Sequence, residues 1–333
     1  EKAASLIKEA IEKNQPIIIH GDYDADGLCA TAILWEAIHD DLGYKNVHPF
    51  IPNRFEHGYG LSIKSLSELD SRWSSSRAKS RDGNGDKLLI TVDCGITSVE
   101  EIKQAKEMGF KIILTDHHLK GDNLPEADAL LWTDQLSGAG IAWVLAQKVL
   151  DAQRTMHDAR EKLDLVALAT IADLQPLTGF NRHLVKEGLV LLNSASSFLR
   201  PGLEALYKVG GIWGKKVSPW EVGWVLAPRL NASGRLENAL DALRLLVTRN
   251  ASQAAEIASK LDTINHERQQ MTQAMYEEAK ATLSLQPSAV SQTQPPTTNY
   301  QLPTTNSPLS FSVRTLAKLL HSKPGLTRRR EKS

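Results

Sequence analysis

The sequence predicts an α/β fold: a doubly wound, mostly parallel sheet with a helical extension and a disordered tail. In the first half of the chain, short apolar runs alternate with helix-like segments, the pattern of consecutive β-α-β units. From about residue 181 the pattern is mostly helical. Residues 281–310 contain five prolines and no charged residue, a composition that cannot form a packed core.

Four short runs rich in β-branched and aliphatic residues are expected to be the strands of this sheet. They are Ile17–His20, Val47–Ile51, Leu88–Val92 and Lys111–Leu114. Helices are expected at Leu28–Leu42, from Ser98 to about Met108, and at Gly138–Ala152. Ser98 and Glu101 have the spacing of a capping box, so we expect the second of these helices to begin there.

The remaining segments complete the predicted layout. Glu1–Lys8 has an amphipathic helical pattern, and residues 72–86 are expected to form an exposed loop insertion. Leu163–Ala172 is apolar and is expected to be a helix that ends at Asp173. Residues 251–283 contain few helix breakers and predict one long, exposed helix.

Composition excludes several classes of protein. The chain has 333 residues, of which 41% are hydrophobic and 23% are charged, as expected of a soluble globular protein. No apolar stretch approaches the roughly 20 residues of a membrane span. The two cysteines, Cys29 and Cys94, predict no disulfide framework and indicate a reducing compartment, the cytoplasm. The chain begins at Glu1 without a methionine, so an upstream organellar targeting segment stays open.

The distribution of charge argues against an indiscriminate nucleic-acid binder. Lys plus Arg and Asp plus Glu both number 39, but residues 311–333 hold seven basic residues against one glutamate. The rest of the chain is therefore net acidic, which disfavours unselective attraction to a polyanion. Metal ions in an acidic pocket would reverse the local field, so a polyanionic substrate remains compatible.

The predicted strands end in carboxylate and imidazole side chains. Asp24 and Asp26 follow the first strand, Asp93 the third, and Asp116-His117-His118 the fourth. Because the carboxyl ends of parallel strands meet at one edge of a sheet, we expect these groups to converge. Carboxylates with a few imidazoles suit Mn²⁺ or Mg²⁺. Several carboxylates can hold two ions about 4 Å apart, which predicts metal-assisted phosphodiester hydrolysis.

Each motif alone has an ordinary structural explanation. Asp and Gly residues in a loop usually form a turn, and a single Asp after a strand is usually a cap. Two adjacent histidines are often surface residues, and Gly138-Ala139-Gly140 is better explained by close helix packing than by phosphate contact. Cys29 and Cys94 are expected to be small buried residues. The occurrence of all the acidic motifs together, in this order, favours the metal centre.

The chain resembles the DHH phosphoesterase superfamily over about residues 1–280. Two segments, Pro52-Asn53-Arg54-Phe55 and Pro228–Arg235, are similar to its single-strand-specific exonuclease branch. The other segments that carry the resemblance are His20–Gly27, Gly58–Leu61, Thr91–Ile96, Thr115–His118, Ala169–Asp173 and Arg200–Gly202.

The resemblance implies a role for each site residue. One metal ion is expected at His20 and Asp24, a second at Asp26, His117 and Asp173, and Asp93 is expected to bridge them.

Outside the ligands, His118 would lie near the scissile phosphate, and Asp116 would orient the imidazoles. Together with Asp93, these two are the expected catalytic residues. Arg229, Asn231, Ser233 and Arg235 would contact the DNA backbone or terminal phosphate from a loop, since arginine offers a rigid fork to phosphate.

The implied function is a two-metal 5′→3′ exonuclease on single-stranded DNA in repair and recombination, using Mn²⁺ or Mg²⁺. Single-stranded DNA is the expected partner, with a single-strand-binding protein or a helicase as further candidates and no membrane. A phosphodiesterase of short oligonucleotides or cyclic dinucleotides and a non-catalytic single-strand-binding module are the alternatives.

Complete members of this branch continue into a second lobe with a Gly-Gly-His motif. Neither that motif nor a further barrel domain is recognisable in this chain, which we therefore expect to be a truncated, frameshifted or split form. The expected divisions are a catalytic α/β domain at 1–178, its helical part with the DNA-contacting segment at 179–250, a connecting helix at 251–283 and a disordered tail at 284–333.

Overall fold

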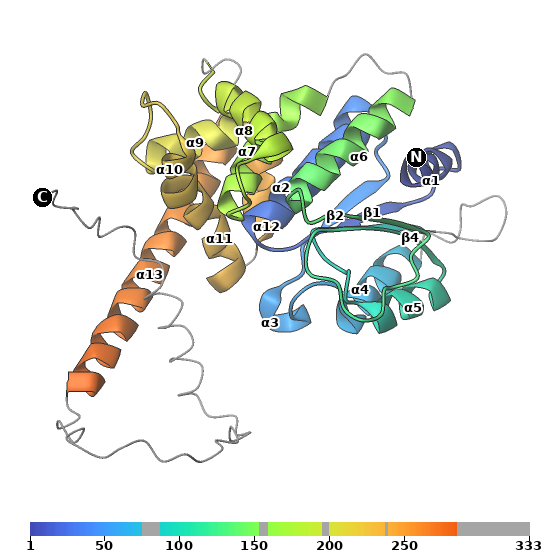
Figure 1. The fold of residues 1–333 in the computed structure, drawn as a ribbon, viewed down its shortest axis with the longest axis horizontal. Coiled ribbons are helices and arrows are strands. Elements are labelled where there is room, and N and C mark those ends of the chain that lie inside the picture. The colour runs from blue at the N-terminus through green and yellow to red at the C-terminus, as the bar shows by residue number, and fades with distance from the viewer. Residues whose placement is uncertain (75–86, 153–158, 195–199, 237–238, 285–333) are drawn as a thin grey trace, which may run out of the picture. The chain divides into compact units, whose positions relative to one another are not determined.

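The structure, a computed structural model, describes residues 1–74, 87–152, 159–194, 200–236 and 239–284. Its centre is a parallel sheet of five strands in the order β2-β1-β3-β4-β5 (Figure 1). The strands are β1 (Ile17–His20), β2 (Val47–Phe50), β3 (Lys87–Val92), β4 (Phe110–Asp116) and β5 (Ala129–Trp132). All four pairings are parallel, which confirms the predicted α/β class.

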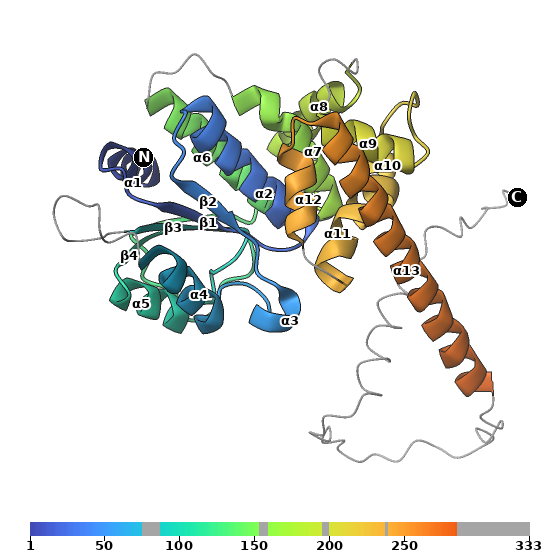
Figure 2. The ribbon, with the colours of Figure 1, turned by 180° about the vertical axis from the view of Figure 1, so that it is seen from behind.

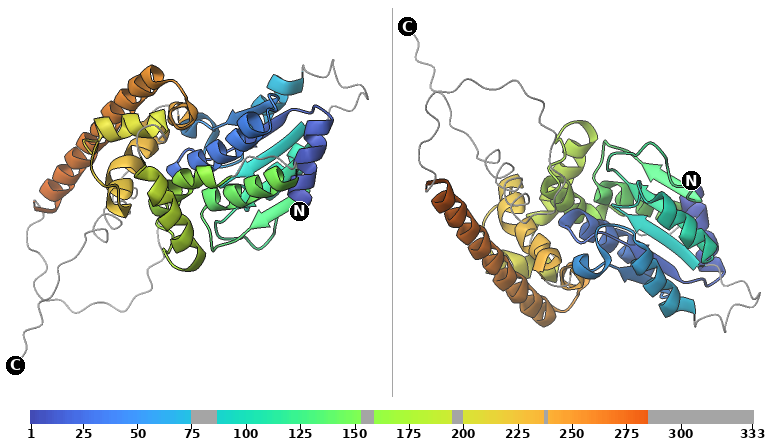
Figure 3. Two further views of the ribbon diagram at one scale, coloured as in Figure 1. Left: turned by 90° about the horizontal axis from the view of Figure 1, so that it is seen from above. Right: turned by 90° about the horizontal axis from the view of Figure 1, so that it is seen from below.

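Alternate residues of the central strands face opposite layers of helices. Ile17 and Ile19 belong to the core under α1 (Lys2–Glu12), α2 (Ala25–Glu36) and α6 (Gly138–Ala152). Ile18 belongs to a second core under α4 (Ile63–Ser74) and α5 (Val99–Glu107). Figure 2 shows the two layers on opposite sides of the sheet, and Figure 3 shows α2 and α6 side by side on one of them. The period-2 alternation of the strands therefore builds the doubly wound arrangement.

Several predicted elements are changed in detail. The predicted helix at 28–42 begins earlier, at Ala25, and ends as a π-helical turn, η1 (Ala37–Asp41). The prediction of a capping box at the start of α5 was wrong. Ser98 precedes the helix, but its backbone has φ −86° and ψ 60°, and its side chain makes no capping hydrogen bond. Strand β5 and the short helix α3 (Arg54–His57) were not predicted.

The helical extension follows the sheet. It consists of η3 (Ala159–Lys162), α7 (Leu163–Ala172), α8 (Gly179–Leu192), α9 (Pro201–Val209), α10 (Pro219–Glu221), η4 (Val222–Leu226), α11 (Ala227–Leu236), α12 (Leu240–Val247) and α13 (Ala251–Ser284). The predicted helices at Leu163–Ala172 and at about 251–283 are confirmed, but the second is not exposed throughout, because Ala254, Ala258 and Leu261 are buried in the core. No described helix combines the length and the apolarity that crossing a bilayer requires.

The chain divides into two units, Glu1–Arg268 and Gln269–Ser333. The sheet and most of the helical extension lie in the first unit, and the division expected within it at residue 178 stays a prediction. Of the predicted loop insertion, residues 72–74 end α4, and residues 75–86 lie outside the described residues. The predicted tail also lies outside them from residue 285 onward.

A buried ionic network joins the extension to the sheet domain. The Arg200 guanidinium forms a two-pronged contact with the Glu36 carboxylate of α2, and its Nε donates to Asp164 Oδ2 of α7 over 2.6 Å. All three residues are buried. Helix α2 begins directly after Asp24, and α7 ends directly before Asp173. This network therefore helps to fix the two helices that frame the site.

Candidate metal centre

The predicted ligands do converge at the carboxyl edge of the sheet. The loop after β1 carries Asp22 and Asp24, and Asp24 caps the start of α2 by accepting from the backbone N–H groups of Asp26 and Gly27. Asp93 follows β3, and Asp116 is the last residue of β4. This is the edge at which parallel α/β sheets place their sites.

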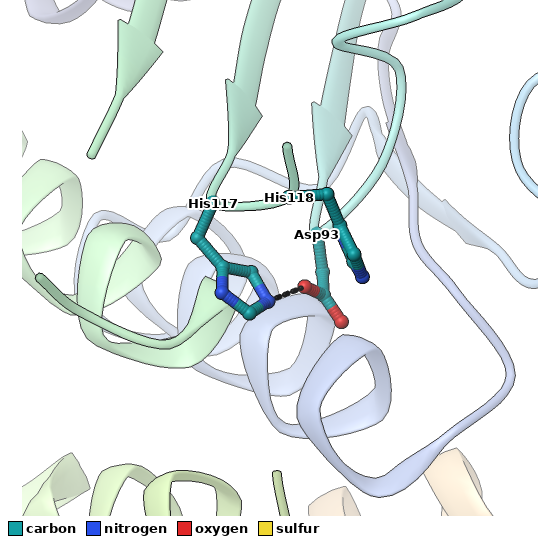
Figure 4. A group of neighbouring side chains, drawn as sticks. All are labelled: Asp93, His117 and His118. Atoms are coloured by element: carbon teal, nitrogen blue, oxygen red, sulfur yellow. Dashed lines mark ion pairs between the residues drawn. The ribbon is translucent and has the colours of Figure 1, made fainter. Parts of the chain in front are cut away.

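Three groups of side chains lie close enough to share an ion, with their ligand atoms within 4.8 Å of one another. They are Asp22, Asp24 and Asp93; Asp26, His117 and Asp173; and Asp93, His117 and His118. Asp93 and His117 each belong to two groups, and their Oδ1 and Nε2 atoms lie 3.0 Å apart (Figure 4). The second group is the ligand set predicted for one ion. In the first, Asp22 stands beside Asp24 where His20 was predicted.

Asp93 is held in an unusual conformation at the centre of the site. Its φ is +62°, in the left-handed region that non-glycine residues rarely adopt, and its side chain is buried. Such strain persists only where the surroundings fix the residue, and it is concentrated at functional sites. The turn therefore aims the Asp93 carboxylate at the ligands from the neighbouring strand ends.

Three buried polar atoms of the site have no hydrogen-bond partner among the described residues: His20 Nε2, Asp93 Oδ1 and His117 Nε2. A buried polar atom without a partner is destabilising, so each such atom requires an explanation. The donor set contains only carboxylate oxygens and imidazole nitrogens, which suit Mn²⁺ or Mg²⁺ better than a thiolate-selective ion. The residues present therefore fit hard divalent cations.

The carboxylates of the site resist ionisation when no cation compensates them. Burial, followed by repulsion from Asp24, raises the pKa of Asp22 to about 7 and that of Asp26 to about 8. Burial also raises the pKa of Asp93, with Asp26 and Asp24 adding to the effect. A divalent cation would supply the missing positive charge.

The imidazoles differ in charge. Burial lowers the pKa of His20 to about 4 and also lowers the pKa of His117, so both are neutral and can offer a lone pair. His118 is 43% exposed, and its Nδ1 lies 2.8 Å from Asp116 Oδ1. This hydrogen bond raises the His118 pKa, so the outward-facing imidazole carries positive charge more readily.

Asp116 organises the strand end without joining any of the three groups. Its carboxylate accepts from the backbone N–H groups of Ile96, His117 and His118 over 2.7–3.0 Å and is paired with His118 Nδ1. Burial pushes the pKa of Asp116 upward, but these hydrogen bonds outweigh burial and lower it. Asp116 therefore holds the His118 imidazole, and its predicted role in orienting the imidazoles for catalysis stays a prediction.

The N-terminus of α6 positions Asp26. The backbone N–H groups of Gly138 and Ala139 each donate to the Asp26 carboxylate over 2.7 Å. Gly138 also packs against Asp93, since a Cβ on this glycine would lie 2.5 Å from Asp93 Oδ1. The first glycine of the Gly-Ala-Gly segment is therefore closely packed, although against the side chain of Asp93 and not against another helix.

The segment predicted to contact DNA forms the helix α11, so the prediction that it is a loop was wrong. Asn231 Oδ1 accepts from the backbone N–H of Ala25 over 2.6 Å, which ties α11 to the loop after β1. Arg229 donates to Asp262 Oδ1 and to the Val225 carbonyl. The Ser233 side chain is buried and donates to the Leu230 carbonyl, and Arg235 lies on α11 with its side chain outside the described set. The predicted DNA contacts stay predictions.

Sequence reasoning missed three residues of the site. Asp22 was quoted in its motif but was not assigned a role, because a third carboxylate in one turn has no spacing rule. Gln175 donates through Nε2 to Asp173 Oδ2 over 2.8 Å, and Tyr59 Oη lies 3.3 Å from His118 Nε2. The Tyr59 contact joins residues from different loops, whereas Gln175 lies only two residues after Asp173, and neither residue type is diagnostic of a metal site.

A parallel sheet with carboxylates and imidazoles gathered at one edge is typical of a class of metal-binding α/β proteins. Comparison with known proteins identifies the family within that class. Residues 16–170 match the DHH family, N-terminal domain. The single-stranded-DNA-specific exonuclease RecJ of Thermus thermophilus is 40% identical over 300 residues, covering 86% of this chain and 42% of the relative. RecJ of Escherichia coli is 35% identical over 298 residues, covering 84% of this chain and 49% of the relative.

A crystal structure of exonuclease RecJ bound to manganese superimposes with a TM-score of 0.71 and 37% identity, covering 83% of this chain and 68% of that one. The chain therefore belongs to the RecJ branch of the DHH family. It spans about half the length of the curated RecJ relatives, or less.

Proposed function

We propose that this chain carries the catalytic centre of a two-ion exonuclease that hydrolyses single-stranded DNA from its 5′ end. The observation that carries the proposal is the convergence of three ligand groups on Asp93 and His117. The names of the RecJ relatives supply the substrate class, and their manganese-bound structure supports the choice of ion. Mg²⁺ has the same preference for oxygen ligands.

The proposed ligand roles follow the geometry. Asp22, Asp24 and Asp93 would hold one ion, and the buried Nε2 of His20, which no described residue hydrogen-bonds, would be a further ligand. Asp26, His117 and Asp173 would hold the other. In a two-ion site the ions activate a water for attack and stabilise the leaving oxygen.

His118 is the proposed catalytic residue at the phosphate. Its exposed imidazole is held by Asp116, which favours the protonated form, and an imidazolium attracts the negative charge of a phosphodiester. Tyr59 Oη approaches the other ring nitrogen, so the ring is positioned from both sides. Asp116 would act only through His118.

The strand-binding role of α11 is also proposed. The Arg229 guanidinium already contacts Asp262 and the Val225 carbonyl, and Asn231 contacts the loop after β1. These contacts favour a supporting role for Arg229, Asn231 and Ser233, and the phosphate contact predicted for Arg235 is retained in the proposal. A backbone contact of this kind would bind a single strand with little selectivity for sequence.

The proposed exonuclease would act in DNA repair and recombination in the cytoplasm, with a single-strand-binding protein or a helicase as partner. No described helix could span a membrane, which is compatible with this assignment.

The test uses a single strand labelled at its 3′ end, incubated with the chain in Mn²⁺ or Mg²⁺. We expect progressive shortening from the 5′ end, resistance of a blunt duplex, and loss of activity with EDTA. Asp93→Ala should abolish hydrolysis, whereas the exposed Asp134→Ala should not. Near-normal turnover of Asp93→Ala would overturn the assignment. Faster cleavage of dinucleotides or cyclic dinucleotides would favour the short-substrate alternative, and binding without hydrolysis would favour the non-catalytic module.

A further inference from the structure

Gln175 lies between two of the proposed metal ligands. Its Nε2 donates to Asp173 Oδ2 over 2.8 Å and lies 3.1 Å from His117 Nδ1. A carboxylate oxygen accepts hydrogen bonds and does not donate them, so the nitrogen of the Gln175 amide must be the atom that faces Asp173. The same NH₂ group therefore presents its second N–H to His117.

This contact fixes the position of the proton on His117. An N–H donor that faces Nδ1 requires a lone pair there, and a neutral imidazole then carries its one proton on Nε2. His117 Nε2 faces Asp93 Oδ1 at 3.0 Å, Asp26 Oδ2 at 3.6 Å and Asp173 Oδ2 at 3.7 Å. A proton on Nε2 therefore points into a space lined by carboxylates.

A cation at the same site requires the opposite tautomer. To ligate through Nε2, His117 must offer the lone pair of that atom, and its proton must lie on Nδ1. The Nδ1–H group would then meet the NH₂ group of Gln175, so that two donors oppose each other. A half-turn of the Gln175 amide removes this conflict, because Oε1 then accepts from Nδ1–H.

The half-turn has a second consequence. It places the Gln175 Oε1 instead of the donor opposite Asp173 Oδ2, and because two oxygen atoms repel each other, the Asp173 carboxylate is then favoured to turn toward the cation. Both changes favour the same outcome, because His117 and Asp173 belong to one ligand group. The amide of Gln175 can therefore favour one of two arrangements of this group but not both at once.

We propose that Gln175 is a positioning residue whose amide orientation couples the His117 tautomer to the availability of Asp173 for a divalent cation. The coupling rests on the proposed metal site and adds a conformational step to it. The proton count balances: Nε2 releases one proton to solvent, Nδ1 takes up one, and the imidazole is neutral in both arrangements.

The test is the His117 tautomer in the full chain labelled with ¹⁵N-histidine, measured by long-range ¹H–¹⁵N correlation spectra. Mg²⁺ is the probe because it is diamagnetic, and its binding is followed separately by calorimetry. The His117 signals are those that disappear in His117→Gln. We expect the Nε2–H tautomer in EDTA and the Nδ1–H tautomer at saturating Mg²⁺.

Two variants separate the coupling from general damage. Gln175→Glu places only acceptors beside Nδ1, so the Nδ1–H tautomer should already be present in EDTA. Gln175→Met removes the amide and should abolish the preference for Nε2–H in EDTA. Gln147→Met is the matched control, because it also removes a glutamine that donates to an aspartate, Asp151 Oδ1 at 3.0 Å, and it should switch as the parent chain does.

The outcomes distinguish this coupling from the metal site itself. If Mg²⁺ binds but His117 has the same tautomer with and without it, the coupling is wrong and the metal site stands. If Gln175→Glu keeps Nε2–H in EDTA, Gln175 does not set the tautomer. If calorimetry detects no Mg²⁺ binding to the parent chain, the metal site and the coupling both fail.

Discussion

Gly138 and Asp93 occupy a space in which no additional carbon atom fits: a Cβ on Gly138 would lie 2.5 Å from both the Cβ and the Oδ1 of Asp93. The first residue of α6 thus limits where the central carboxylate can lie. The neighbouring N–H groups of the same helix end hold Asp26. One helix terminus therefore positions two proposed ligands through its backbone alone.

The first prediction is that Gly138→Ala weakens metal binding although it removes no ligand. The added methyl group must displace Asp93, and displaced or unsupported ligands typically weaken affinity by about tenfold or more. Calorimetric titration with Mn²⁺ measures the effect. Gly223→Ala is the control, since a Cβ at Gly223 meets no atom within 4 Å.

A double-mutant cycle attributes the effect to the contact with Asp93. Overpacking typically destabilises a fold by about 1–3 kcal/mol, so urea unfolding in EDTA should detect Gly138→Ala in the parent chain. In an Asp93→Gly background the nearest atoms are gone, and glycine tolerates the φ of +62°. An equal loss of stability in both backgrounds would contradict the steric explanation.

The second prediction concerns pH. The folded-state pKa values of Asp22 and Asp26, about 7 and about 8, lie above the unfolded value near 3.9. The folded state therefore binds more protons, and stability in EDTA should fall as pH rises from 6.5 to 8, by up to about 1.4 kcal/mol per pH unit for each carboxylate. Below pH 6.5 the lowered pKa of His20 acts in the opposite direction.

Urea midpoints measured in EDTA at pH 6.5, 7.2 and 8 test this slope. Asp26→Asn should flatten it, and saturating Mg²⁺ should reverse it, because ligands must be deprotonated to bind. A stability in EDTA that rises with pH over this range would show that the carboxylates are not protonated in the folded state.

Local rules were sufficient to predict most of the sheet and the convergence of its acidic motifs. Strands β1, β3 and β4 have strong apolar runs, and the rule that sites form at carboxyl strand ends brings Asp26, Asp93 and His117 together. Strand β5 was missed because it lies at the edge of the sheet, where only Ala129 of its four residues is buried.

What the sequence did not predict depends on contacts between distant segments. Asn231 meets Ala25 across 206 residues, and no local pattern encodes that pairing. The capping box failed although its spacing was right, because the backbone of Ser98 is not in the extended conformation that an N-cap uses. Spacing specifies which groups are available, and the tertiary structure decides which contacts they make.

The third prediction concerns the buried network around Arg200. Arg200→Met should lower the free energy of unfolding by about 3–5 kcal/mol, because Asp164 would be left buried without its cation and Glu36 would keep only the exposed Arg249, 3.4 Å away. Arg244→Met is the control: Arg244 is 58% exposed, and its pairing with Asp241 should contribute less than about 1 kcal/mol. Urea denaturation in EDTA compares the two, and equal small effects would contradict a structural role for the network.

The fourth prediction separates two residues of α11. Asn231→Ala removes the acceptor for the Ala25 N–H, so the loop that carries Asp24 should loosen and Mn²⁺ affinity should fall. Asn231→Asp keeps a carbonyl-type oxygen there and should retain more of that affinity than Asn231→Ala. Arg229→Ala breaks the contact with Asp262 and should lower stability while leaving Mn²⁺ affinity nearly unchanged.

Calorimetry with Mn²⁺, urea denaturation in EDTA and fluorescence-detected binding of a single strand give the three readouts for each variant. If Arg229→Ala abolishes strand binding at unchanged stability, its guanidinium leaves Asp262 for the DNA and the phosphate contact first predicted for Arg229 is right. If Asn231→Ala leaves Mn²⁺ affinity intact, the Ala25 contact does not position the ligand loop. Because the two residues lie on the same helix, a general disturbance of α11 would change all the readouts together.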